Sequence, residues 1–182
     1  MFDNYEFGLE LRDAHISRIE QSEENMIKIL DWTKNPKNIL FMGGSVGTGK
    51  SYLASSFYNY FKENNKNIRV YSETHLFAEL KLCMHLPSYT PEYRMKNIAE
   101  AEYFILDDFG ANLSEDPAKS EWCKNMLFQF LDSRYSNSLP TLITSNLGKH
   151  EIDKIFHDRF SSRLYARKNT IINTNGPDRR QQ

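Results

Sequence analysis

The stretch Gly44-Ser45-Val46-Gly47-Thr48-Gly49-Lys50-Ser51 decides the fold of this chain. It contains a glycine, four variable positions and then Gly-Lys-Ser, which is the spacing of the phosphate-binding P-loop. The apolar run 39–42 precedes it and predicts a buried strand, and a helical pattern from Lys50 to about Asn64 follows it. In this setting the glycines let backbone N–H groups turn toward phosphates at the positive end of a helix. A glycine-rich turn that binds nothing is the alternative, and the complete set of fixed positions favours binding of a nucleoside triphosphate.

The P-loop pattern also assigns roles to individual side chains. Lys50 is expected to reach the β- and γ-phosphates, and the Ser51 hydroxyl is expected to help hold Mg²⁺. ATP and Mg²⁺ are therefore the predicted cofactors. The residues expected to bind the nucleotide are Gly44, Ser45, Val46, Gly47, Thr48, Gly49, Lys50, Ser51 and Tyr52.

Strand and helix patterns alternate outward from this loop. Residues 9–33 have near-helical apolar spacing and predict one or two amphipathic helices. We therefore divide the chain into a helical lead-in, residues 1–37, and an ATPase core, residues 38–182. The alternation predicts a three-layer α/β fold with a five-stranded parallel sheet and nucleotide at the carboxyl ends of the strands. The predicted strands are 39–42, 68–72, 103–106, 141–144 and 170–173, and the predicted helices are 50–64, 73–85, 93–101, 151–160 and one beginning after Asp116-Pro117.

Composition restricts the classes of partner and compartment. The 182 residues carry a net charge of −1, so any contact with nucleic acid must come from a local patch. The two cysteines, Cys83 and Cys123, lie far apart and indicate reduced thiols rather than a disulfide framework. No apolar run is long enough to cross a bilayer, and no export signal is recognisable. We therefore expect a cytoplasmic protein that does not associate with a membrane.

An acidic pair follows the predicted strand 103–106. Asp107 is expected to bind Mg²⁺ together with Ser51, because a buried carboxylate needs a cation or hydrogen bonds. Asp108 would then polarise the water that attacks the γ-phosphate. A helix or loop cap is the alternative for this pair. Asp108 is one methylene shorter than glutamate, which predicts slow turnover.

Two further groups of polar residues follow later in the chain. Asn146 ends the predicted strand 141–144, where it is expected either to orient water near the γ-phosphate or to cap the next helix. Arg159 and Arg163 are four residues apart and so share one face of a helix. Arginine makes forked contacts with phosphate. Spacing alone, however, favours the interpretation that these two arginines are a solvated surface pair.

In order along the chain, these motifs resemble those of AAA+ ATPases of the DnaC/DnaI/IstB helicase-loader group. Residues 44–51 resemble Walker A, 104–110 Walker B, 144–146 sensor 1 and 158–164 the arginine-bearing box. Phe2-Asp3-Asn4-Tyr5 is similar to the segment that precedes the core in these proteins. The resemblance covers nearly the whole chain and implies an AAA+ core with no C-terminal lid.

The resemblance implies an ATPase that acts as a replicative helicase loader on single-stranded DNA. It implies a homo-oligomer in which Arg163, or as second choice Arg159, enters the ATP site of a neighbouring subunit. Lys81, Arg94 and Lys96 lie in the segment that lines the DNA path in this group. A solvated basic face is the alternative for those three. An IstB-like transposition helper that binds duplex DNA, and a regulatory module that binds ATP without hydrolysing it, remain alternative functions.

Overall fold

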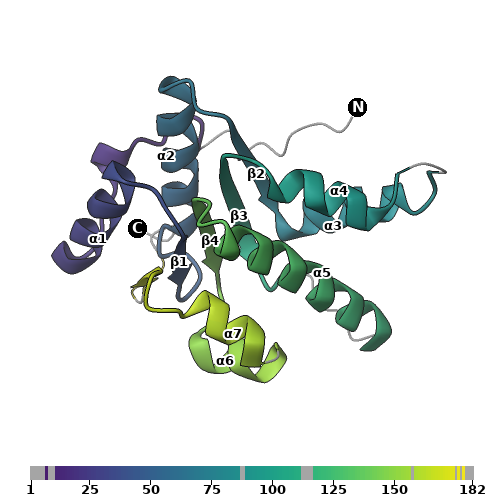
Figure 1. Ribbon diagram of the computed structural model, residues 1–182. Coiled ribbons are helices and arrows are strands. Elements are labelled where there is room, and N and C mark those ends of the chain that lie inside the picture. The colour runs from purple at the N-terminus through teal and green to yellow at the C-terminus, as the bar shows by residue number, and fades with distance from the viewer. Residues whose placement is uncertain are drawn as a thin grey trace.

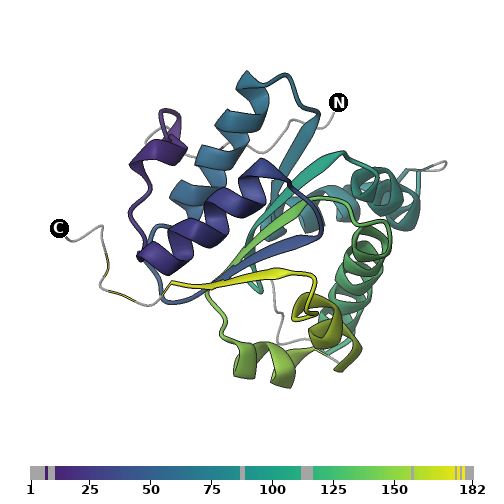
Figure 2. The same cartoon turned by 60° about the vertical axis from the view of Figure 1, so that its left-hand side comes forward.

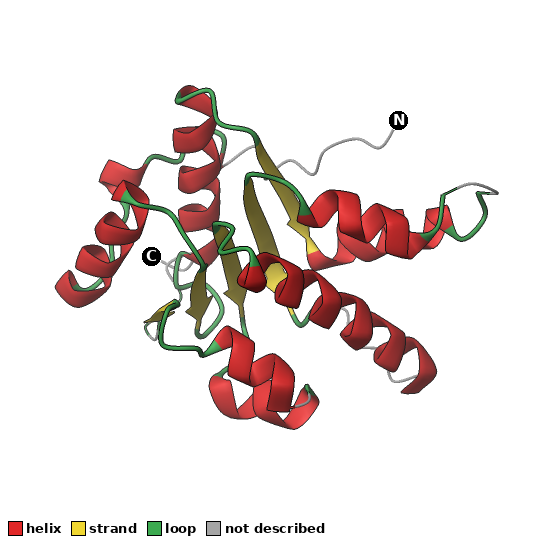
Figure 3. Cartoon of the chain, in the orientation of Figure 1, coloured by secondary structure: helices red, strands yellow, loops and turns green. Residues whose placement is uncertain are grey.

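The computed structural model describes residues 7, 11–86, 89–111, 117–156, 158–174, 176 and 178. Its centre is a five-stranded sheet in the order β2-β3-β4-β1-β5, and every strand pairing is parallel (Figure 3). This confirms the predicted five-stranded parallel sheet. The strands are β1 (Ile39–Gly43), β2 (Ile68–Ser72), β3 (Tyr103–Phe109), β4 (Thr141–Ser145) and β5 (Thr170–Asn173).

Helices cover both faces of the sheet and complete the predicted three layers. One face carries α1 and α2, and the other carries α3 to α7 (Figures 1 and 2). The described part of the chain contains no helix that is both long and apolar enough to cross a membrane. The helices are the 3₁₀ helix η2 (Ile16–Arg18), α1 (Glu23–Lys34), α2 (Lys50–Glu63), α3 (Glu73–Cys83), α4 (Pro91–Ala99), α5 (Pro117–Ser136), α6 (Lys149–Ile155) and α7 (Asp158–Leu164).

The core is divided into two clusters by the sheet, because successive side chains of a strand point to opposite faces. Leu40 and Met42 of β1 pack with Trp32 of α1 and Phe57 of α2. Phe41, from the same strand, belongs to the cluster formed with α3 to α7. Strands buried on both faces in this way explain why the sequence shows continuous apolar runs rather than alternation.

The predicted helix 93–101 is shifted by two residues in the structure, to Pro91–Ala99, and the predicted helix 151–160 is divided. The predicted helix 151–160 is two helices, α6 and α7, because Phe156 adopts an extended backbone and turns into the core. Its ring stacks on Phe109 and Phe160, at centroid separations of 5.1 and 4.4 Å. In the lead-in, the described residues of 9–33 include η2 and α1, and α1 begins after Ser22, whose side chain accepts a hydrogen bond from the Asn25 N–H.

Candidate nucleotide-binding site

The P-loop lies between β1 and α2 with the backbone that phosphate binding requires. Gly49 has a φ of 90° and caps α2 in the left-handed conformation, which glycine adopts without strain. At Gly44 a Cβ atom would lie only 2.3 Å from the carbonyl oxygen of Thr174, so only glycine fits there. The loop is therefore shaped both by its own glycines and by the segment that follows β5.

Lys50 is held inside the loop. Its side chain is only 5% exposed, and its Nζ donates hydrogen bonds to the carbonyls of Gly44, at 2.9 Å, and Ser45, at 2.7 Å. These bonds hold the ammonium group at the edge of the loop. A positive charge in this position is suited to the phosphates of a nucleotide.

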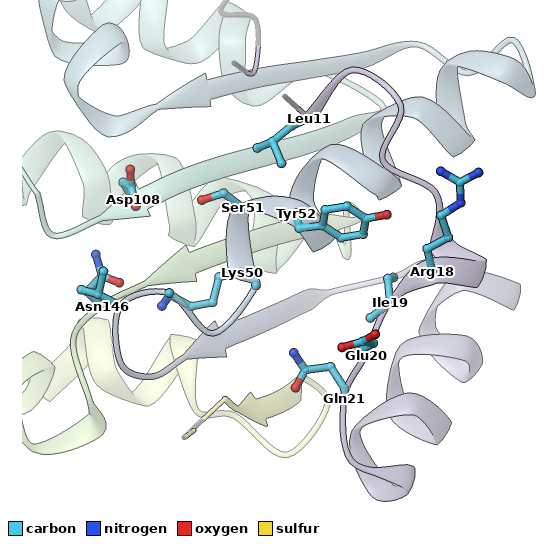
Figure 4. Close-up of a pocket in the computed structure, with 13 residues that line it drawn as sticks. Leu11, Arg18, Ile19, Glu20, Gln21, Lys50, Ser51, Tyr52, Asp108 and Asn146 are labelled. Carbon is cyan, nitrogen blue, oxygen red and sulfur yellow. The ribbon is translucent and has the colours of Figure 1, made fainter. Parts of the chain in front are cut away.

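A cavity of about 730 Å³ lies over the loop and is large enough for a nucleotide (Figure 4). P-loop residues form one side of it, and residues from the lead-in form the other. Asp108 and Asn146 lie at the same cavity although they come from different strand ends (Figure 4). The lining residues are Leu11, Arg18, Ile19, Glu20, Gln21, Val46, Gly47, Gly49, Lys50, Ser51, Tyr52, Asp108 and Asn146.

Asp107 is buried beside the loop and is 2% exposed. Its Oδ1 accepts a hydrogen bond from the Thr144 hydroxyl and lies 3.5 Å from Ser51 Oγ. Burial, together with the negative charge of the adjacent Asp108, raises the pKa of Asp107 to about 6, although the hydrogen bonds from Thr144 and Ser51 oppose the shift. The structure thus brings together the two residues predicted to bind metal.

The donor set at Asp107 fits Mg²⁺. Magnesium prefers oxygen ligands and is usually held by one or two protein oxygens together with waters and substrate phosphates. The Ser51 hydroxyl and the Asp107 carboxylate supply such oxygens next to the phosphate loop. The described residues contain no cluster of three or more His, Cys, Asp or Glu that would form an all-protein metal cage. A metal bound with the nucleotide is the arrangement that these residues support.

Asp108 lies on an irregular part of β3. Its φ is 54°, and its N–H donates to Thr144 Oγ1 at 3.0 Å. Its side chain lines the cavity, so the structure does not support the alternative reading in which the acidic pair caps a helix or loop. Sequence reasoning singled out both carboxylates and included Thr144 only as part of the sensor 1 stretch, so it missed that the Thr144 hydroxyl contacts both residues.

Asn146 does not cap the following helix. The N-cap of α6 is Gly148, and its N–H donates to Glu151 Oε2 at 2.6 Å. Asn146 instead is exposed at the cavity, opposite Lys50 (Figure 4). Of the two alternatives weighed for this residue, the geometry supports the one beside the phosphates.

The two arginines of α7 do not line the cavity of their own chain. Arg163 Nε donates to Asp132 Oδ1 of α5 at 2.7 Å, and its guanidinium lies 5.2 Å from the centre of the Tyr135 ring. Arg159 is exposed and forms no ion pair with any residue that the structure describes. Of the two arginines, Arg159 therefore has the guanidinium that is better placed to contact another molecule.

The three cations considered for DNA also differ from one another. Lys81 of α3 and Lys96 of α4 are exposed. The Arg94 side chain is only 16% exposed and pairs with Glu79 between the two helices. It also reaches the Tyr71 hydroxyl at 3.5 Å, so it serves the packing of α3 against α4 rather than the solvent face.

The lead-in contributes residues to the cavity that the sequence did not indicate. Gln21 Nε2 donates to the Thr48 carbonyl at 3.2 Å, and Ser55 Oγ of α2 donates to the Leu11 carbonyl at 2.7 Å. Leu11, Arg18, Ile19, Glu20 and Gln21 thereby become one wall of the site. Their helical apolar spacing gave no signal for this, because their positions depend on contacts with α2 and the P-loop.

Comparison with known proteins agrees with this geometry. The family model described as IstB-like ATP binding protein matches residues 2–169. The replicative helicase loader DnaC of Escherichia coli (strain K12) is 22% identical over 163 residues, which are 90% of this chain and 62% of that protein. The chain spans about half to three-fifths of the length of the curated helicase loaders that it matches.

Two solved structures share the fold. A crystal structure of the DnaC helicase loader superposes with a TM-score of 0.74 at 17% identity, over 92% of this chain and 99% of that one. The replication initiator DnaA bound to AMPPCP and single-stranded DNA superposes with a TM-score of 0.75 at 17% identity, over 90% of this chain and 50% of that one. These likenesses show that the chain shares the fold of these two proteins.

Proposed function

Because this chain belongs to the family of IstB-like ATP-binding proteins, we propose that it is a Mg²⁺-dependent ATPase that loads a replicative helicase onto single-stranded DNA. The observation that carries the proposal is the meeting of Lys50, Ser51, Asp108 and Asn146 at one cavity, with Asp107 beside Ser51. The helicase task is supported by the relative from Escherichia coli, which is a replicative helicase loader.

Each residue has a defined task in this proposal. The N–H groups of loop 44–49 hold the phosphates, and Lys50 balances their charge. Ser51 and Asp107 would hold Mg²⁺, which when bound neutralises charge on the transferring phosphoryl group. Asp108 accepts the proton of the attacking water, and Asn146 keeps that water or the γ-phosphate in position.

Nucleotide binding and hydrolysis are separated by two substitutions. Lys50→Ala is expected to weaken ATP binding, because it removes the cation from the loop. Asp108→Asn is expected to keep binding and to lower turnover by about 10²- to 10⁴-fold, because it removes the proton acceptor. Binding of a fluorescent ATP analogue and phosphate release at several protein concentrations provide the two measurements. Full hydrolysis in Asp108→Asn would show that another group activates the water, and full binding in Lys50→Ala would refute the P-loop assignment.

The helicase partner is tested by mixing the chain with the replicative helicase of its own organism. Light scattering measures the mass of any complex, with ATP and then with ADP, and Lys50→Ala is the matched control. We expect a complex whose mass depends on which nucleotide is present and which Lys50→Ala does not form. The absence of a complex with either nucleotide would remove the helicase from the proposal and leave the ATPase in place.

A second candidate is a transposition helper, which the IstB-like family description favours. Such a protein would bind duplex rather than single-stranded DNA. Fluorescence anisotropy with a single-stranded oligonucleotide and its duplex, both with ATP, separates the two functions. Preference for the duplex together with no helicase complex would favour the transposition helper, and binding of ATP with no turnover at high protein concentration would favour a regulatory module that does not hydrolyse it.

A further inference from the structure

The carboxyl end of β3 contains one more residue than its neighbour β4. Leu106 pairs with Ile143, but the next paired residues are Phe109 and Ser145, so three steps along β3 match two along β4. Asp108 lies inside this bulge with a φ of 54°. A left-handed backbone is uncommon for residues other than glycine, although aspartate adopts it more readily than most, and here the surrounding bonds hold it in place.

The bulge explains how two consecutive carboxylates serve one site. Successive side chains of a regular strand point to opposite faces, so Asp107 and Asp108 would diverge. Here Asp107 approaches Ser51 to 3.5 Å while Asp108 lines the cavity over the same loop. A bulge re-aims a side chain in this manner.

One hydroxyl of β4 contacts both members of the pair. Thr144 is fully buried, and its Oγ1 donates to Asp107 Oδ1 while it accepts from the Asp108 N–H at 3.0 Å. A threonine hydroxyl has one proton to donate and lone pairs to accept with, so both bonds form at the same time. The orientation of one carboxylate is thus linked to the backbone of the other.

Neighbouring side chains hold the rest of the turn. Ser145 Oγ donates to the Phe109 carbonyl at 2.7 Å, and Glu73, which is 1% exposed, accepts from the Gly110 N–H at 2.6 Å. These two bonds hold the backbone of the residues that follow the acidic pair. Of the β4 residues Thr144 and Ser145, the first contacts the acidic pair and the second contacts the backbone after it.

We propose that Thr144 is a positioning residue that orients Asp107 toward the metal and holds Asp108 forward in the bulge, which compensates for the short side chain of an aspartate. This inference rests on the proposed ATPase function and deepens it. Thr144 thereby keeps the carboxylates of Asp107 and Asp108 at one cavity.

Thr144→Val and Thr144→Ser test the hydroxyl, because valine keeps the shape and serine keeps the donor. The first readout is the Mg²⁺ concentration that strengthens binding of a fluorescent ATP analogue, which requires no hydrolysis. We expect Thr144→Val to raise this concentration about 10-fold or more, as removal of an outer-shell partner does, and to leave nucleotide binding without Mg²⁺ unchanged. Thr144→Ser is expected to restore the wild-type value to within about threefold. An unchanged Mg²⁺ requirement in Thr144→Val overturns the proposal.

Turnover gives the second readout, with Ser145→Ala as the matched control. Thr144→Val should lower kcat by about 10²-fold, whereas Ser145→Ala, which removes a hydroxyl bonded only to backbone, should lower it far less. An equal loss in both variants would indicate a merely structural role and would overturn the assignment. If the wild type hydrolyses ATP and Asp108→Asn abolishes it while Thr144→Val does not, this inference fails and the proposed function stands. If the wild type does not hydrolyse ATP, the ATPase proposal fails and the Mg²⁺ readout still decides the role of Thr144.

Asp108→Glu provides a test that does not depend on the folding of a variant in the buried core. If the bulge already brings Asp108 close enough, the extra methylene misplaces the carboxylate, and kcat is expected to fall. A rise in kcat of about fivefold or more would show that the aspartate falls short and would overturn the compensation argument.

Discussion

Asp107 is a buried carboxylate whose partners among the described residues include the hydroxyls of Thr144 and Ser51. Its ordinary pKa is 3.8, and burial raises the pKa to about 6 in the folded protein. Between about pH 4 and pH 6 the folded state therefore keeps a proton that the unfolded state has released. Stability contributed by this group is largest below pH 4 and is lost as the pH rises through 6.

Asp107→Asn should consequently stabilise the free protein at neutral pH. A shift of about two pKa units corresponds to about 3 kcal/mol, so this is the expected upper limit of the gain in free energy of unfolding at pH 7.5. The gain should fall as the pH is lowered through 6 and should vanish toward about pH 3, below both pKa values, where the carboxyl is neutral in both states. Urea unfolding in EDTA and without nucleotide measures it. Asp108→Asn is the comparison, and it should give a smaller gain because it removes only the neighbouring charge. A less stable Asp107→Asn protein at pH 7.5 would contradict the argument.

At the scale of residues, contiguous motifs made most of the site predictable. The P-loop and the acidic pair are each read from a few adjacent positions, and Asn146 follows its strand directly. The role of Thr144 could not be predicted, because it depends on a bulge where β3 pairs with β4. Thr144 and Asp108, which are joined by a hydrogen bond there, lie 36 residues apart in the sequence. The same reason hid Gln21, whose contact with Thr48 joins the lead-in to the loop.

At the scale of elements, α3 and α4 form a hairpin that extends away from the sheet (Figure 1). The spacing of cations along these helices was visible in the sequence, but the ion pair between Glu79 and Arg94 was not. A carboxylate on one helix determined which cation of the other helix turned inward. Patterning therefore predicted both helices to within two residues at each end and could not separate Arg94 from Lys81 and Lys96.

The exposed cations of this hairpin are expected to contact phosphates if the chain binds single-stranded DNA. Tyr89 and Tyr93 pack edge to face at a centroid separation of 5.1 Å, and Tyr93 is 53% exposed, so an aromatic surface for base stacking is available. Replacing Lys81 and Lys96 together by alanine should lower the magnitude of the salt dependence of binding, d log K/d log[salt], by about 1.4, because each phosphate contact on a single strand contributes about 0.7.

Fluorescence anisotropy with a labelled oligonucleotide at several salt concentrations measures this change. Lys34→Ala with Lys37→Ala is the matched control, because it removes the same charge from exposed positions at and just after α1, the helix on the other face of the sheet. Equal effects of the two double variants would mean that binding follows net charge, and the hairpin would then have no special part in it.

At the scale of the whole molecule, the cavity is lined by the lead-in, the P-loop and the ends of β3 and β4, and no residue of α7 lines it. Phe109, directly after the acidic pair, stacks on Phe160 of α7 at 5.4 Å and an interplanar angle of 5°. The overall fold was predictable because the alternation of strands and helices leaves few topologies. The sequence could not separate Arg159 from Arg163, because the difference between them depends on the contact of Arg163 with Asp132 of α5.

Mixing inactive chains tests whether α7 completes the site of a neighbour. Arg159 is exposed and unpaired among the described residues, whereas Arg163 is held by Asp132, so we expect Arg159→Ala to lose turnover and Arg163→Ala to lose less. Lys50→Ala keeps its arginines, and Arg159→Ala keeps its ATP site. In an equal mixture that assembles at random, about a quarter of the interfaces pair an intact site with an intact arginine, so about a quarter of the wild-type rate should return.

Phosphate release from each variant alone and from the mixture, at equal total protein concentration, gives the comparison. The positive charge from the neighbour would stabilise the transition state, which explains why neither variant alone should be active. If the mixture recovers no activity over a wide range of concentrations, the site is complete within one chain and assembly is not required. If Arg163→Ala loses turnover and is rescued while Arg159→Ala stays active, the bond to Asp132 opens on assembly, and Arg163 rather than Arg159 enters the neighbouring site.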